Sequence, residues 1–168
     1  MRPRAAIGAA LGLLFLLAAL AQLRPAGYTK IELTDESGRK ILALVTADEE
    51  RLTLTWRNSL FGLLVTEVFF TRGGLLVEDA VTFAAADGSP APKVSSRDVD
   101  DLFHTGGAFT ASGLNRPFSR IIYRIGEIGD PKIAVKDRTI ALKHEAGFGG
   151  KVILSANVPR LYEVLLQR

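Results

Sequence analysis

The sequence contains no cysteine among its 168 residues. This absence excludes disulfide bonds, thiolate metal ligands, a cysteine nucleophile and a lipid-modified cysteine. Only two histidines are present, His104 and His144, and they lie on separate segments without the spacing of a zinc site. The acidic residues Asp98, Asp100 and Asp101 lack the glycine and the downstream glutamate of a calcium-binding loop. We therefore expect neither a bound metal nor a cofactor.

The chain also carries little net charge. Its formal charge is +3, from 21 basic and 18 acidic residues. Two of the 21 basic residues, Arg2 and Arg4, belong to the N-terminal segment, which leaves 19 basic against 18 acidic residues in the body. A near-neutral body without a cluster of lysine and arginine has no electrostatic footprint for DNA or RNA. We expect no nucleic-acid partner.

The longest apolar run of the sequence lies at the N-terminus. Met1–Arg4 is basic, and the 17 residues from Ala5 to Ala21 are apolar. Basic residues stay on the cytoplasmic side, so the body, residues 22–168, is predicted to be a single extracytoplasmic domain. Ala19–Ala21 has the small-x-small form of a signal peptidase site, while about 17 residues also suffice to span a bilayer. Whether residues 1–21 are a signal peptide or a signal anchor stays open.

Beyond this segment, apolar and polar residues alternate and turn signals recur at short intervals. Within residues 51–57, Leu52, Leu54 and Trp56 fall on one face and two threonines on the other, which is typical of a half-buried antiparallel strand. Gly73-Gly74 predicts a two-residue hairpin. The same criteria predict strands at residues 28–33, 40–46, 51–57, 64–72, 75–84, 121–125, 132–136, 139–143 and 152–158.

Short strands without helical periodicity between them predict an all-β fold. We expect an antiparallel β-sandwich or a partly open barrel, preceded by an N-terminal hydrophobic helix. Residues 160–167 fit either a last strand or a short helix. Residues 85–117 break the strand pattern with prolines, an acidic cluster and a glycine-rich run. Connections of this length are often functional or disordered, so this segment is the expected place for a binding loop.

The hairpin of residues 51–72 carries the candidate site residues. Arg57, Asn58 and Ser59 lie at its turn, and Glu67 interrupts its second apolar strand. If the Glu67 face is inward, the carboxylate must find a hydrogen-bond or charge partner. The alternative is that Glu67 points to water from an edge of the sheet. We predict that Arg57, Asn58, Ser59 and Glu67 form a polar network, either structural or ligand-binding.

No catalytic constellation accompanies these residues. Ser59 and Ser112 lack the nucleophile-elbow context, so any Ser–His pair would have to be assembled by the fold. The glycine-rich run of residues 106–113 lacks the Lys-Ser/Thr ending of a phosphate-binding loop. We expect a protein that is not an enzyme, with a small hydrolase as the remaining catalytic alternative.

The order of these motifs resembles a known family. Trp56-x-Asn58-Ser59 is followed by Val65-x-Glu67-x-Phe69 and then by Gly73-Gly74, and Ile128-Gly-Asp-Pro-Lys132 comes later in the chain. This order resembles the domain of unknown function family 1850, small exported proteins encoded beside TAXI-type TRAP transporters. Residue by residue, the family motif matches Asn58, Ser59 and Glu67.

The resemblance implies a context outside the cytoplasm. It implies an uncharacterised, non-enzymatic β-rich accessory or binding protein whose partner would be a TRAP transporter subunit or a small solute. The alternative is a structural or protein-interaction module of the cell envelope that is unrelated to transport. In both cases the membrane would be contacted through the N-terminal segment if that segment remains uncleaved.

Overall fold

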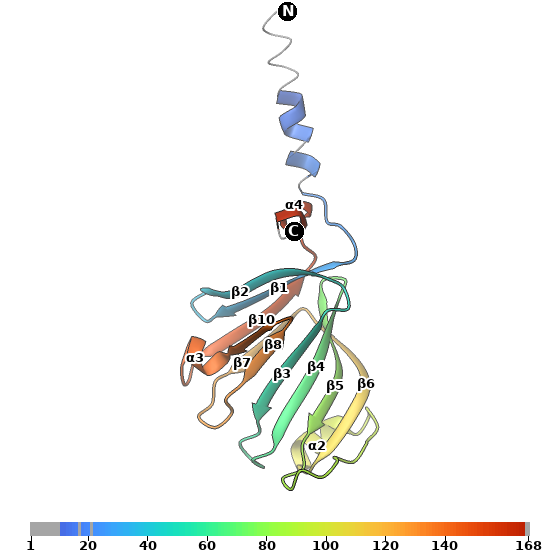
Figure 1. Cartoon of the computed structure of the whole chain (residues 1–168), viewed down its shortest axis with the longest axis vertical. Coiled ribbons are helices and arrows are strands. Elements are labelled where there is room, and N and C mark those ends of the chain that lie inside the picture. The colour runs from blue at the N-terminus through green and yellow to red at the C-terminus, as the bar shows by residue number, and fades with distance from the viewer. Residues whose placement is uncertain (1–10, 17, 21, 167–168) are drawn as a thin grey trace, which may run out of the picture.

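The computed structural model describes residues 11–16, 18–20 and 22–166 of the chain. The basic segment Met1–Arg4, the first part of the apolar run and the candidate cleavage site at Ala21 lie outside the described residues. Residues 11–16 and 18–20 are helical and exposed, and they extend away from the sheets (Figure 1). Within the described ranges, no helix combines the length and the apolar character needed to cross a membrane.

The described part of the chain forms ten strands in two antiparallel sheets (Figure 1). The body is thus mostly β, with short helices, which is consistent with the predicted all-β sandwich. The strands are β1 (Tyr28–Asp35), β2 (Lys40–Ala47), β3 (Arg51–Arg57), β4 (Leu64–Arg72), β5 (Leu75–Phe83), β6 (Phe109–Phe118), β7 (Arg120–Arg124), β8 (Lys132–Val135), β9 (Arg138–Ala141) and β10 (Lys151–Asn157). The smaller sheet has the order β2-β1-β10-β7, and the larger sheet has the order β6-β5-β4-β3-β8-β9.

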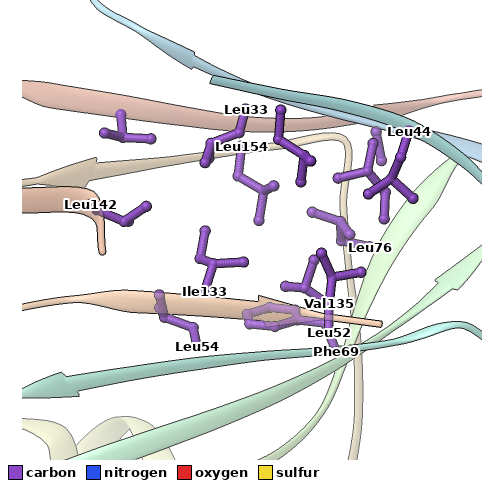
Figure 2. Close-up of a cluster of buried hydrophobic side chains, with 14 of the residues drawn as sticks. Leu33, Leu44, Leu52, Leu54, Phe69, Leu76, Ile133, Val135, Leu142 and Leu154 are labelled. Atoms are coloured by element: carbon purple, nitrogen blue, oxygen red, sulfur yellow. The ribbon is translucent and has the colours of Figure 1, made fainter. Parts of the chain in front are cut away.

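The main core lies between the two sheets, as Figure 2 shows. Alternation places Leu33 of β1 and Leu154 of β10 side by side in one sheet, while Leu52 of β3 and Val135 of β8 are paired in the other. All four side chains are buried in one cluster. Each such side chain contributes roughly 1.5–3 kcal/mol by leaving water, so the inward face decides the register of every strand.

A second, smaller core lies on the larger sheet beneath helix α2 (Val99–Thr105). Phe83 of β5 stacks on Phe109 of β6 with ring centroids 4.8 Å apart, and Phe103 of α2 meets Phe83 edge-on at 5.0 Å. Trp56 of β3 packs against both the main core and this second core. The inner face of the larger sheet between the two cores is where polar side chains gather.

The segment of residues 85–117, predicted as a long connection, also contains regular structure. Its last part belongs to β6, a ten-residue strand that pairs with β5 at seven positions, with a bulge between Glu78 and Ala80. Gly113 and Asn115 have positive φ angles of 70° and 50°, so this strand is locally irregular. Because of these loop-forming residues, the sequence pattern did not predict a strand here. The strand is held extended by pairing with its partner rather than by its own propensity.

The last two helices, α3 (Leu142–Ala146) and α4 (Leu161–Leu166), bear on two sequence predictions. Helix α3 replaces the end of the predicted strand at residues 139–143, because Leu142 leaves the strand to bury its side chain in the main core. Helix α4 decides between the two alternatives for the C-terminus. It lies near the base of the N-terminal helix (Figure 1), where the backbone N–H of Leu161 donates to the carbonyl oxygen of Leu23 at 2.7 Å.

Candidate functional site

Asn58 caps the turn between β3 and β4. Its side chain is buried, and its Oδ1 accepts hydrogen bonds from the backbone N–H groups of Leu60 and Phe61, both at 2.9 Å. A short polar side chain that satisfies two backbone donors is a local substitute for backbone pairing in a turn. Asn58 therefore holds the turn in one conformation.

Arg57 and Ser59 lie on either side of this cap. The Arg57 guanidinium donates to the carbonyl oxygen of Gly62 at 2.6 Å, and its backbone N–H donates to the carbonyl oxygen of Gly129 at 2.7 Å. The second bond ties the end of β3 to the loop of residues 125–131. Ser59 is exposed. The structure thus brings three of the four predicted network residues together at the turn.

Glu67 lies apart from them, in the middle of β4. Its pairing partners are Leu54 on β3 and Val81 on β5, and both of those side chains are fully buried. Its same-face neighbours on β4, Val65 and Phe69, are buried as well. Among the interactions that the structure describes, none joins Glu67 to the turn residues. The carboxylate is instead aimed into the space between the sheets.

This apolar surrounding changes the acidity of Glu67. Burial raises the pKa of its carboxyl group from 4.5 to about 7, and the neighbouring carboxylate of Glu78 adds to the rise. The indole N–H of Trp56 opposes the rise because it favours the charged form. That N–H is nevertheless buried without a partner at standard hydrogen-bond geometry, so its contact with Glu67 is loose. Glu67 changes charge near neutral pH.

Glu78 is the second carboxylate of this region. It is only 5% exposed and stands opposite Phe69 of β4 and Arg116 of β6. Burial raises the pKa of Glu78, while the guanidinium of Arg116 counteracts the rise. Arg116 also donates to Asp100 of α2 at 2.9 Å, so its charge is shared between two acids. The inner face of the larger sheet therefore holds more negative than positive groups.

Tyr123 approaches both carboxylates from the opposite sheet. Burial raises the pKa of its phenol above the ordinary value, and the charges of Glu67 and Glu78 raise it further. Its hydroxyl is buried and, like Trp56 Nε1, has no hydrogen-bond partner in the part of the chain that the structure describes. A buried polar group without a partner costs about 1–3 kcal/mol, so two at one place require an explanation.

Trp56, Glu67 and Tyr123 line one cavity between the sheets, which we name the inter-sheet cavity. Its volume is about 200 Å³. It is lined by Trp56, Glu67, Ile122, Tyr123, Arg124, Gly129 and Pro131. A water molecule occupies about 30 Å³ of liquid, so the cavity has room for a small organic molecule or for several waters.

A neighbouring hollow of about 320 Å³, which we name the outer hollow, adjoins the inter-sheet cavity. The two share Trp56, Arg124 and Gly129, and the outer hollow also reaches Arg57 and Ser59. Glu67 thus lines the inter-sheet cavity, and two of the turn residues line the hollow that adjoins it. The segment of residues 85–117, the expected binding loop, contributes no lining residue to either space.

The sequence pattern indicated Glu67 as a candidate site residue, but it did not indicate Trp56, Tyr123 or Glu78. Glu78 did give a signal, since it interrupts an apolar strand as Glu67 does. Within the described ranges there is no group of three or more His, Asp or Glu side chains able to hold a metal ion. Comparison of the chain with family models, with curated proteins and with solved structures gave no match.

Proposed function

We propose that this protein is an exported β-sandwich domain that binds a small solute, without chemistry, as an accessory of a TAXI-type TRAP transport system. The observation that carries the binding role is the inter-sheet cavity, where the buried Tyr123 hydroxyl has no described hydrogen-bond partner and the Trp56 N–H makes only a loose contact with Glu67. Preformed pockets with a few convergent polar groups are the usual places of small-molecule binding. A bound solute would supply the missing hydrogen bonds.

The transport context rests on the sequence. The order of the motifs around Asn58, Ser59 and Glu67 resembles family 1850, whose members are encoded beside such transporters. The basic and then apolar N-terminal segment supports a location outside the cytoplasm, as an exported or N-terminally anchored protein. No nucleophile, base and orienting group converge at the described cavity, and this supports binding over catalysis.

The surface near the outer hollow suits contact with another protein. Leu60 is 80% exposed and Ile128 is 55% exposed. Leu64 and Phe61 of the β3–β4 turn region are exposed as well, and Leu64 and Ile128 line one shallow hollow. Exposed apolar side chains that gather at one place are typical of interaction sites. A transporter subunit that covered them would receive the solute directly from the hollow.

The binding role is tested with the full chain in a nonionic detergent. Trp56 is the only tryptophan of the sequence and lines the cavity, so its fluorescence reports occupancy directly. We expect saturable changes with one class of small solutes from the culture medium or from a metabolite library. A failure of every solute to change the fluorescence would overturn the binding role.

The transport role needs a separate measurement. We expect the affinity-tagged chain, expressed from its own locus, to co-purify the membrane subunits of a TAXI-type TRAP transporter, and its deletion to reduce uptake through that system. The double substitution Leu60→Ser with Ile128→Ser should weaken the co-purification and leave solute binding unchanged. Unchanged uptake and recovery of envelope proteins without any transporter subunit would favour the interaction module instead.

A further inference from the structure

The charged groups around the inter-sheet cavity point to the chemistry of its ligand, an inference that rests on the proposed binding role. Glu67 projects from β4, and the groups that face it are Trp56 from β3, Glu78 from β5 and Tyr123 from β7. Arg116 of β6 lies beside Glu78 and is already bonded to Asp100 of α2. Arg124 of β7 is the cation among the described lining residues of the cavity, and it also lines the outer hollow.

Among the described interactions, none pairs the Glu67 carboxylate with a cation. Glu67 and the Tyr123 phenol line the inter-sheet cavity, and the Glu78 carboxylate lies close enough to raise the pKa of both groups. Arg116, beside Glu78, is shared with a third acid, Asp100. The pKa of all three groups lies above its ordinary value, which is the direction that an added cation would reverse. The Trp56 and Tyr123 rings add two π-systems, whose faces attract organic cations.

We propose that the inter-sheet cavity binds a small ligand through a protonated amine, which sits on the Glu67 carboxylate between Trp56 and Tyr123. The ammonium group donates to Glu67, and the Tyr123 hydroxyl accepts from it or turns toward its substituent. Arg124 is placed to pair with a carboxylate if the ligand has one at its other end. The shared chemistry is the ammonium group, and its source is either a simple amine or a zwitterionic amino acid.

Binding is coupled to a proton. At a pH where Glu67 is protonated, entry of R–NH₃⁺ gives Glu67–COO⁻ paired with R–NH₃⁺ and releases one H⁺ to solvent. An alkylammonium group keeps its own proton throughout this range, since its pKa is about 10. Because the pKa of Glu67 lies at about 7, the affinity is expected to be about tenfold weaker at pH 6 than at pH 8.

The test uses the full chain in nonionic detergent with three probes of matched length. n-Propylamine carries only the amine, β-alanine carries an amine and a carboxylate, and propionate carries only the carboxylate. Calorimetry in two buffers of different ionisation heat measures affinity and proton release at about pH 6 and about pH 8. We expect an amine-bearing probe to bind more tightly at the higher pH, by about tenfold, and to release a proton at the lower one.

Two variants separate the site from the fold. Glu67→Gln should abolish amine binding at both pH values, and Tyr123→Phe should weaken it several-fold. Glu36→Gln is the matched control, since Glu36 is exposed in the turn between β1 and β2 and should change nothing. Binding of n-propylamine identifies a simple amine as sufficient, whereas binding of β-alanine alone shows that Arg124 needs its carboxylate partner. Both results support the inference.

Other outcomes overturn it and remain distinguishable from failure of the binding role. Propionate that binds more tightly at the lower pH would show that protonated Glu67 donates to an anion, which removes the amine inference and keeps a solute-binding site. Amine binding that survives in Glu67→Gln would place the ammonium elsewhere. If no probe binds while library solutes still change Trp56 fluorescence, the amine chemistry is wrong and the binding role stands.

Discussion

Replacement of Glu67 by glutamine should make the protein more stable at neutral and alkaline pH. The carboxylate is enclosed by fully buried apolar neighbours on β3 and β5 and faces a second acid, Glu78. Ionised Glu67 therefore costs the folded state free energy that it does not cost the unfolded chain. Glutamine has nearly the same shape, carries no charge and still offers an oxygen to the indole N–H of Trp56.

The magnitude follows from the acidity. A pKa that rises from 4.5 to about 7 on folding corresponds to about 3 kcal/mol, since each pH unit of difference is worth about 1.36 kcal/mol. The folded state binds the proton more tightly, so the penalty is absent below about pH 4.5, grows as the pH rises and is complete above about pH 7. Imperfect hydrogen bonding of the buried glutamine amide costs about 1 kcal/mol of folding stability. The expected net gain in the free energy of unfolding is therefore about 2 kcal/mol at pH 8.

Urea unfolding of the full chain in nonionic detergent measures this gain. Circular dichroism follows the transition, because Trp56 fluorescence itself responds to the substitution beside it. We expect the wild-type protein to lose stability between about pH 5 and pH 8, and Glu67→Gln to lose about 2–3 kcal/mol less over the same interval. Glu78 is present in both proteins, so the difference between the two curves isolates Glu67. Parallel curves would refute the buried, proton-binding carboxylate and everything derived from it.

Three further substitutions test other parts of the structure, each by the same urea unfolding. Tyr123→Phe removes a buried hydroxyl without a described partner, so stability should stay constant or rise by about 1 kcal/mol, and a loss above that size would reveal a hidden partner. Asn58→Ala leaves two backbone N–H donors unpaired and should lower stability by about 1–2 kcal/mol. Ser59→Ala, at the exposed neighbouring position, should change stability by less than about 0.5 kcal/mol. Equal effects would contradict the capping role of Asn58. Gly74→Ala should cost about 2–3 kcal/mol, because its φ is 80° and its Cβ would lie 2.5 Å from the backbone nitrogen of Val158; a neutral result would show that this turn yields.

The fold was predictable wherever one strand could be judged by itself. The alternation in residues 51–57 and the Gly73-Gly74 turn correctly gave β3, β4 and β5, because burial of one face decides both the strand and its register. β6 was missed, since Gly113 and Asn115 have positive φ and break the local pattern. Its extended form depends on β5, a strand about thirty residues earlier, and single-strand propensity carries no such information.

The candidate site was only half predictable for the same reason. Glu67 was recognisable as a charge in an apolar strand, and the turn residues nearest in sequence were taken as its partners. Its neighbours in space are Glu78 on the next strand and Tyr123, which comes from the opposite sheet. Tyr123 has no distinguishing signal in the sequence. A tyrosine in an alternating strand is normally a core residue, and only the packing of the two sheets shows that its hydroxyl lacks a partner.

Removal of a polar group is expected to change stability in opposite directions at the turn and at the inter-sheet cavity. This contrast distinguishes residues with a structural role from residues with a functional one. At the turn, the Asn58 oxygen satisfies two donors, so removing it should lower stability. At the cavity, Glu67 and Tyr123 are enclosed without adequate described partners, so Glu67→Gln should raise stability and Tyr123→Phe should raise it or leave it unchanged. A fold gains nothing from groups that weaken it, and such groups concentrate at sites that bind ligands. The cavity is therefore assigned to function if Glu67→Gln stabilises the protein and abolishes ligand binding while Tyr123→Phe weakens binding without loss of stability. Destabilisation by both substitutions would assign it to the architecture.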